Sequence, residues 1–202
     1  MLRGGYTSPL ALLGSSYTNA LTAAPLLTTA VTASSLSVLS DGLSQGVELR
    51  GKNVPASWDV ERSAWQAVWG GAIAGVMLFY WYRLLAFLFP RARTSVTQLV
   101  LKVFTNQLIM SPGLNGGFFA FVIFTRTVPK LQMDTEKWSL LAAKYKRDLL
   151  PTIMRSCAYW TVVQTINFTV LPAQFTTVST NFFLLIWTTY LCLIANRKVK
   201  KD

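Results

Sequence analysis

Residues 156–196 read SCAYWTVVQTINFTVLPAQFTTVSTNFFLLIWTTYLCLIAN, and this run contains no charged side chain. A transmembrane helix needs about 20 consecutive apolar residues, so the run is long enough to cross a bilayer twice, with a turn at Pro172. It therefore predicts a transmembrane hairpin. The first arm places Trp160, Gln164 and Asn167 on one helical face. Such a polar face inside hydrocarbon must lie against other helices or a water-filled path.

The composition extends this interpretation to the whole chain of 202 residues, since 52% of them are hydrophobic and only 13% are charged. We expect one transmembrane helical domain over residues 25–196. A polar or amphipathic N-terminal segment, residues 1–24, precedes it, and a basic tail, residues 197–202, follows it. The N-terminal segment fits either a short amphipathic surface helix or a mitochondrial presequence, although Arg3 is its only cation.

The chain carries 19 Lys and Arg against 8 acids, a net charge of +11. Because the cations lie between apolar runs, they favour anionic lipid headgroups as partners, and we expect no nucleic acid. Histidine, the commonest general base and metal ligand, is absent from the sequence. No nucleotide-binding or catalytic motif occurs, so we expect neither an enzyme nor a cofactor or metal.

The first span is expected at residues 26–47, where polar residues recur at steps of three and four along one helical face. These residues are Ser34, Ser37, Asp41, Ser44 and Glu48, with Gln45 adjoining. A lone carboxylate inside a span costs about 3 kcal/mol on insertion scales. Asp41 therefore fits either an interfacial acid solvated by headgroups or an acid that lines a pore or pairs with a cation such as Lys102 or Arg155.

A second span is predicted at residues 63–90, with Trp and Tyr residues near both ends, as is typical of membrane interfaces. Gly71 and Gly75 form a small-residue face within it. Such a face lets a neighbouring helix approach closely, so we expect both glycines to lie in a helix contact.

Two further apolar segments, residues 94–111 and 114–128, flank Pro112 and Gly113. Proline and glycine break helices, so we predict two short helices that turn back on each other at this point. This arrangement gives six crossings with most cations and both termini on one side, as the positive-inside rule expects.

Residues 134–148 are the one sizeable polar stretch, and they fit an amphipathic helix whose cations meet headgroups on the positive side. The predicted fold class is therefore an all-α, polytopic integral membrane helix bundle. It would have about six membrane segments, some of them short, and one amphipathic surface helix.

Residues along nearly the whole chain also resemble a known family pattern. Before and within the first span these are Tyr17, Leu21, Pro25, Asp41 and Gln45; in the middle they are Trp81, Tyr82, Leu85, Pro90, Lys102, Gln107 and Pro112. The most specific part is C-terminal and comprises Trp160, Gln164, Asn167, Phe168, Pro172, Trp187, Tyr190 and Leu191. This pattern resembles the Mpv-seventeen and twenty-two-kilodalton peroxisomal membrane protein family.

The resemblance implies an all-helical protein of the mitochondrial inner membrane or, alternatively, the peroxisomal membrane, acting as a small-solute channel. The chain departs from the pattern at three positions. Asn106 replaces an acid beside Gln107, Thr161 replaces a proline, and Thr176 replaces an arginine. Losing an acid and an arginine would leave a less charged path for a solute.

Two functions remain open at this point. In the channel hypothesis, polar residues of three spans line the path of a solute: Ser37, Asp41, Gln45, Asn106, Gln107, Gln164 and Asn167. In the structural hypothesis, the same side chains hydrogen-bond helices together, at about 0.6 kcal/mol each, in an accessory subunit of a respiratory or ATP-synthase complex.

Overall fold

The computed structural model describes residues 9–50, 57–91, 95–127, 134–169 and 176–197, and all regular secondary structure in these ranges is helical. The elements are α1 (Pro9–Ala23), α2 (Pro25–Arg50), α3 (Val60–Val68), η1 (Trp69–Gly75), α4 (Val76–Leu88), α5 (Val96–Arg126), α6 (Thr135–Lys144), η2 (Tyr145–Leu149), α7 (Leu150–Thr169) and α8 (Thr176–Asn196). Within this part of the chain, four helices are long and apolar enough to cross a membrane: α2, the continuous helix Val60–Leu88, α5 and the Ser179–Asn196 part of α8. The prediction of an all-α polytopic membrane bundle is confirmed.

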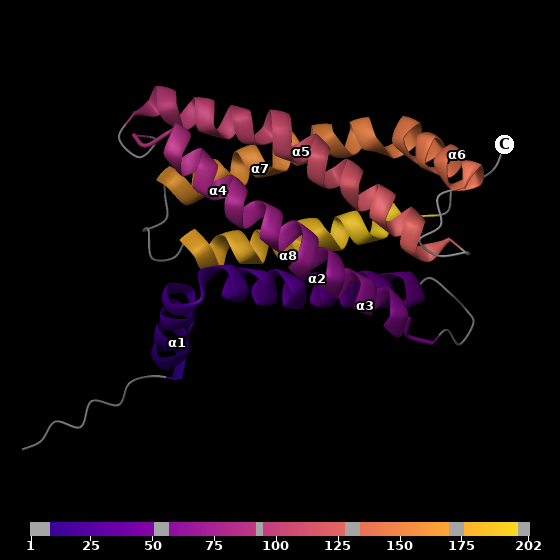
Figure 1. The fold of residues 1–202 in the computed structure, drawn as a ribbon, viewed down its shortest axis with the longest axis horizontal. Coiled ribbons are helices and arrows are strands. Elements are labelled where there is room, and N and C mark those ends of the chain that lie inside the picture. Colours follow the sequence, from indigo (N-terminus) through magenta and orange to yellow (C-terminus); the bar gives the residue numbers. More distant parts are fainter. Residues whose placement is uncertain (1–8, 51–56, 92–94, 128–133, 170–175, 198–202) are drawn as a thin grey trace, which may run out of the picture.

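The long helices run side by side between two ends of a bundle (Figure 1). At one end, drawn on the left, lie α1, the end of α4, the start of α5 and the start of α8; we call it the α1 end. At the opposite end, drawn on the right, lie the start of α3, the end of α5, α6 and the end of α8; we call it the α6 end.

Side-chain caps set the starts of three helices. Asp59, Ser95 and Asp134 each accept a hydrogen bond from the backbone N–H three residues later, at the starts of α3, α5 and α6. Capping of this kind satisfies one of the amide groups that the first turn of a helix leaves without a partner. Proline serves the same purpose in α1 and α2, which begin at Pro9 and Pro25, because proline has no N–H to satisfy.

The predicted turn at Pro112 and Gly113 is wrong, because α5 continues through Pro112 as one helix of 31 residues. A membrane helix tolerates an internal proline when neighbouring groups compensate for the lost hydrogen bond. The nearby glycines admit large neighbours: a Cβ on Gly117 would lie 3.3 Å from the Trp69 ring, and the Tyr145 hydroxyl donates a hydrogen bond to the Gly116 carbonyl over 2.8 Å. These glycines therefore serve packing, and α5 does not reverse.

Because α5 is one helix and not two, the loops that follow it lie on the opposite side of the membrane from the one predicted. The end of α4 and the start of α5 lie at the α1 end, whereas α6 lies at the α6 end (Figure 1). Arg197 lies near α6, because its carbonyl accepts a hydrogen bond from Lys144. Most described cations, including Arg126, Lys144 and Lys146, also lie near the α6 end. The positive-inside rule therefore predicts that the α6 end is the inner side of the membrane that the chain spans.

The amphipathic surface helix expected at residues 134–148 is only partly correct. It is helical, as α6 and η2, but Lys137 and Lys144 are buried rather than turned to headgroups. The Lys144 ammonium donates to the backbone carbonyls of Ile194 and Arg197 at the end of α8, and it pairs with Asp148 over 3.0 Å. Lys144 therefore satisfies the carbonyls that the last turn of a helix leaves open.

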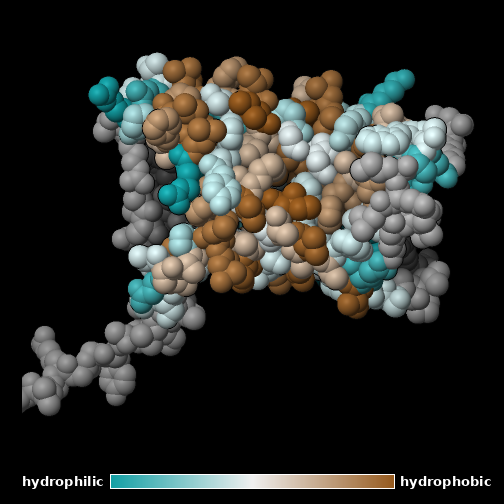
Figure 2. Space-filling view, viewed as in Figure 1, coloured by the Kyte–Doolittle hydropathy of each residue, from teal (hydrophilic) through white to brown (hydrophobic). Residues whose placement is uncertain are grey.

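Apolar side chains cover the middle of the bundle, while hydrophilic residues gather towards its ends (Figure 2). Large hydrophobic residues such as Phe87, Val100 and Leu108 are exposed on the outer surface. This distribution is the one that contact with lipid requires.

Helix α2 packs against η1 through small residues. A Cβ on Gly71 would lie 3.1 Å from the Ser34 Cβ, and a Cβ on Gly75 would lie 3.1 Å from the Ala33 Cβ. One on Gly70 would collide with the Ser37 hydroxyl at 2.2 Å. The two backbones approach this closely only because η1 lacks side chains at these positions.

We predict that Gly71→Leu and Gly75→Leu each lower the free energy of unfolding by about 1–3 kcal/mol, because the new side chain forces the two helices apart. Thermal unfolding of the purified protein in mild detergent measures the effect. Gly46→Leu is the matched control, since a Cβ on Gly46 would meet no packing neighbour within 4 Å. Equal stability of all three variants would contradict the prediction.

We also predict that a cysteine at position 91 and one at position 146 react with a membrane-impermeant reagent from opposite sides. Both positions are exposed, at the α1 and α6 ends respectively. The background carries Cys157→Ala and Cys192→Ala. Labelling of both positions from the same side of sealed vesicles would contradict the arrangement in Figure 1.

Candidate functional site: a central cavity and a buried ion-pair network

A cavity of about 540 Å³ lies between the helices, in the half of the bundle towards the α1 end. Its walls come from α1, α2, η1, α4, α5, α7 and α8. Most of the lining is apolar, but several helices also contribute amide and hydroxyl side chains to it. These include Thr32, Ser37, Asn106, Gln107, Ser111, Asn115, Gln164, Thr180 and Asn181. We call this space the central cavity.

Two amide side chains on α5 are held differently. The Asn106 Oδ1 accepts a hydrogen bond from the Trp81 indole over 2.8 Å, which orients the amide and leaves its Nδ2 group for a ligand. The Gln107 Nε2 is buried and has no hydrogen-bond partner within the described residues. An amide donor buried without a partner costs about 1–3 kcal/mol, so a solute that accepts a hydrogen bond at this point would be stabilised.

Arg83 is the single charged residue among the described residues that line the central cavity. It lies on the same face of α4 as Phe79, with its guanidinium carbon 5.3 Å from the centre of the Phe79 ring. This distance is typical of a cation–π contact, which holds the charge beside an apolar wall.

Aromatic side chains close the central cavity towards the α6 end. Trp69, Phe118 and Trp187 line the cavity and also belong to the buried core. The Trp69 and Phe118 rings lie 5.3 Å apart, and Trp187 stacks on Tyr159 at 5.4 Å. We call Trp69, Phe118 and Trp187 the aromatic layer.

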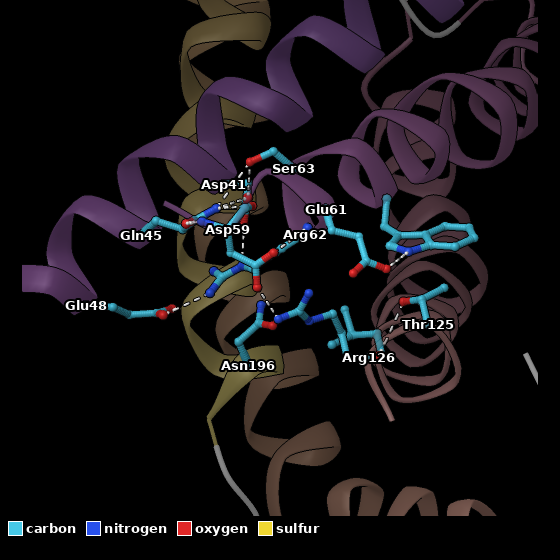
Figure 3. A network of polar contacts seen from close by, with 12 residues as sticks. Asp41, Gln45, Glu48, Asp59, Glu61, Arg62, Ser63, Thr125, Arg126 and Asn196 are labelled. Atoms are coloured by element: carbon cyan, nitrogen blue, oxygen red, sulfur yellow. Dashed lines mark hydrogen bonds and ion pairs between the residues drawn. The ribbon is translucent and has the colours of Figure 1, made fainter. Parts of the chain in front are cut away.

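Beyond the aromatic layer, Asp41 and Arg62 form a buried ion pair between α2 and α3 (Figure 3). The Arg62 Nε lies 2.6 Å from the Asp41 Oδ1, and the two residues are 5% and 0% exposed. Gln45 and Ser63 donate to the other Asp41 oxygen, each over 2.8 Å. Each oxygen of the carboxylate therefore has a donor, which is what a buried charge requires.

The remaining donors of Arg62 extend the network. Its two terminal nitrogens donate to Ser44 over 2.6 Å and to Glu48 over 2.8 Å. Asp59, the N-cap of α3, accepts from the Arg62 backbone N–H and pairs with Arg126 of α5 (Figure 3). The network thus joins α2, α3 and α5 at the α6 end.

Asp59 lies just outside the membrane-spanning helix. Its partial burial alone would raise the pKa of the carboxyl, but the hydrogen bonds from Arg126 and from the Arg62 backbone outweigh burial and hold the pKa below its usual range. The carboxylate therefore stays charged at physiological pH.

The structure divides the predicted polar residues into two groups. Ser37, Asn106, Gln107 and Gln164 line the central cavity, whereas Asp41 and Gln45 lie in the ion-pair network outside it. The side chain of Asn167 lies outside the described residues. The expected partners of Asp41, Lys102 and Arg155, are wrong, because Arg62 fills that place and Arg155 donates to the Tyr190 hydroxyl instead.

The predicted signature residues of the C-terminal hairpin lie on α7 and α8 where they are described. Trp160 and Trp187 line the central cavity, and Tyr190 packs against the buried core. The Phe168 side chain and Pro172 lie outside the described residues.

Sequence reasoning missed Arg62 and Arg83 as site residues. A signal for Arg62 is present in the sequence. Polar residues recur at helical spacing at the start of the second predicted span, just as they do in the first span: Asp59, Arg62, Ser63 and Gln66. When two consecutive helices carry acidic and basic residues next to the loop that joins them, these residues are predicted to form ion pairs with each other. No comparable signal marks Arg83, since an arginine near the end of a span also fits a snorkelling side chain.

Comparison with known proteins identifies the family. A family model described as "Mpv17 / PMP22 family" matches residues 132–192, which contribute α6, η2, α7 and most of α8. PXMP2/4 family protein 4 of Dictyostelium discoideum is 30% identical over 79% of this chain and 80% of that protein. The chain belongs to the Mpv17 / PMP22 family.

Other family members match at lower identity. Peroxisomal membrane protein 2 of Bos taurus is 28% identical over 88% of this chain and 86% of its own length. Protein SYM1 of Saccharomyces cerevisiae is 27% identical over 74% of this chain and 73% of its own length. No solved structure shows significant similarity to the chain.

The ion-pair network gives a direct prediction. Asp41→Asn removes the fully buried carboxylate that faces the Arg62 Nε and leaves only the partly exposed Glu48 to balance the guanidinium charge, so we expect a loss of up to about 3–5 kcal/mol in stability. The double variant Asp41→Leu with Arg62→Met removes both charges and should recover most of that loss. Unfolding in detergent measures both effects, with Glu136→Gln, an exposed acid, as the control. Unchanged stability of Asp41→Asn would contradict a structural role for the pair.

Proposed function

We propose that this protein, an integral membrane member of the Mpv17 / PMP22 family, has a non-enzymatic role and conducts small solutes through the central cavity. The observation that carries the proposal is the division of the polar residues into two groups. Asp41, Gln45 and Arg62 bond to one another and hold helices together. Asn106, Gln107 and Gln164 instead line an open space.

The presence of polar residues that line a cavity, separate from those that join helices, favours passage of a solute over an exclusively structural role. Side chains that only join helices make their hydrogen bonds with each other, because an unpaired polar group in an apolar medium is costly. Four described residues carry a buried polar atom without a partner, namely Glu48, Gln66, Gln107 and Thr152, and of these only Gln107 lines the cavity of about 540 Å³. Its position beside that space does not fit an exclusively structural role. It fits a group that exchanges water or solute for a hydrogen-bond partner.

The aromatic layer supports a gate between the cavity and the α6 end. A solute that enters from the α1 end meets Trp69, Phe118 and Trp187 before it reaches the ion-pair network. Conduction therefore requires these rings to move apart, which implies low basal conductance. Hydrophobic constrictions of this kind gate other channels by excluding water.

We propose the mitochondrial inner membrane as the location, with the peroxisomal membrane as the alternative. The family resemblance supports the first, and the name of the bovine relative, Peroxisomal membrane protein 2, supports the second. Exposed cations such as Lys146 and Arg147 at the α6 end fit anionic headgroups in either membrane. Fractionation of cells that express a tagged full-length chain distinguishes the two locations.

We predict that Trp187→Leu increases conductance several-fold in planar bilayers, because a smaller side chain weakens the aromatic layer. Phe182→Leu on the exposed face of the same helix is the control and should not change conductance. Absence of conductance in both wild type and Trp187→Leu, in samples that unfold cooperatively, would contradict the proposal. Stoichiometric co-purification with respiratory or ATP-synthase subunits would then favour the accessory-subunit role.

A further inference from the structure

The distribution of charge along the bundle is strongly asymmetric. The described acids all lie in the half towards the α6 end: Asp41, Glu48, Asp59, Glu61, Asp134, Glu136 and Asp148. In the half towards the α1 end, the described charged residues are Arg83, Arg91 and Lys102, and Arg155 lies at the level of the central cavity, next to the lining residue Ser156. The half that holds the central cavity therefore carries only positive charge among the residues described.

The lining of the cavity repeats this asymmetry. Arg83 is charged, and no aspartate or glutamate is present among the described lining residues. The ring of Phe79 beside the guanidinium supplies no opposite charge, and no carboxylate pairs with Arg83 in the described part of the chain. Arg83 is an exposed residue that also lines the cavity. An anion inside the apolar cavity lies in a lower dielectric than water, so Arg83 attracts it more strongly than it would attract the same anion in water.

Two amide donors share the lining of the central cavity with Arg83, namely Asn106 and Gln107. The Trp81 indole fixes the Asn106 amide, so that the Asn106 Nδ2 group remains for a ligand. Gln107, the next residue, has a buried Nε2 without a described partner. A guanidinium and two amide donors are the groups that bind carboxylate and phosphate oxygens.

The remainder of the cavity is apolar. Its walls beyond these donors include Leu78, Met110, Leu114, Trp160 and Leu184. A volume of about 540 Å³ lies within the usual range of sites for small organic molecules, about 300–1,000 Å³. A ligand that matches both the hydrogen-bond donors and the apolar walls of the cavity has an anionic head and an apolar body.

A second cavity, of about 600 Å³, lies between α5 and α7 and shares Gln107 and Gln164 with the central cavity. The other residues that line it are almost all apolar, and two of them, Val100 and Phe104, are exposed on the outer surface. The two glutamines therefore stand between the lipid-facing surface and the central cavity.

From these observations we infer that the central cavity binds amphiphilic monoanions, such as medium-chain carboxylates. The carboxylate lies at Arg83, Asn106 and Gln107, the apolar chain lies along the inner walls, and the ligand enters from the lipid between α5 and α7. This inference rests on the proposed function, because it assigns a class of solute to the same cavity.

The test measures binding to the full-length protein in nanodiscs of neutral phosphatidylcholine. The probe is 12-bromododecanoate, whose bromine quenches the fluorescence of the tryptophans that line the cavity. We expect saturable quenching by the acid and at least about tenfold weaker binding of 12-bromododecanol, which lacks the charge but partitions into the same lipid.

Variants locate the site. Arg83→Gln and Gln107→Met should each weaken binding of the acid by about tenfold and leave binding of the alcohol unchanged. Arg91→Gln is the matched control, because it removes one exposed charge from the same end without altering the cavity lining. Equal binding of acid and alcohol, or equal binding by Arg83→Gln and wild type, would overturn the inference.

Two further measurements distinguish this inference from simpler explanations and from the proposed channel function. If acetate displaces the probe as well as dodecanoate does, the cavity recognises small anions only, and the role assigned to the apolar walls is wrong. Bilayer conductance, measured on the same samples, keeps the two proposals apart. Conductance without saturable binding contradicts only the ligand class, whereas binding without conductance contradicts only the channel.

Discussion

The buried ion pair between Asp41 and Arg62 is the interaction on which the arrangement of the first helices depends. Each charge would be prohibitively costly alone in an apolar interior. Together with Ser44, Gln45 and Ser63, the pair satisfies its polar atoms inside the protein. Because α2 and α3 must keep these groups opposite each other, the pair fixes the register of the helices that flank the first loop.

Small residues then determine how closely the same helices approach beyond the network. η1 contacts α2 through glycines, so the backbones lie close together there. Further along, α4 contributes Leu78, Phe79 and Arg83 to the lining of the central cavity instead. Large side chains cannot pack as closely as glycines, so α2 and α4 separate and leave the central cavity between them. The cavity and the tight contact are consequences of one change in side-chain size along a single helix.

The two π-helical segments also have local causes. η2 ends just before Leu150 and Pro151, and Pro151 has no N–H to donate to the carbonyl four residues earlier. A wider turn at this point accommodates the proline and lets α6, η2 and α7 continue as one helix. η1 includes Gly70 and Gly71, which have no side chains and whose backbone lies directly against α2. Such segments are often found at functional sites, and η1 lines the central cavity.

The sequence by itself determined the class of the protein and the position of most helices, because apolar runs of sufficient length fold as helices in a membrane whatever their neighbours are. It also indicated which faces of the helices are polar. Only the tertiary structure decided the course of the chain at Pro112, where α5 continues as one helix and packs through Gly116 and Gly117 against Tyr145 and Trp69, residues of other helices. It likewise decided which polar residues bond to each other and which line a cavity. Helical spacing predicts that both Asp41 and Gln107 face the interior of the bundle. Whether such a side chain meets a partner there, as Asp41 meets Arg62, or lines a cavity, as Gln107 does, depends on which other helices pack against it.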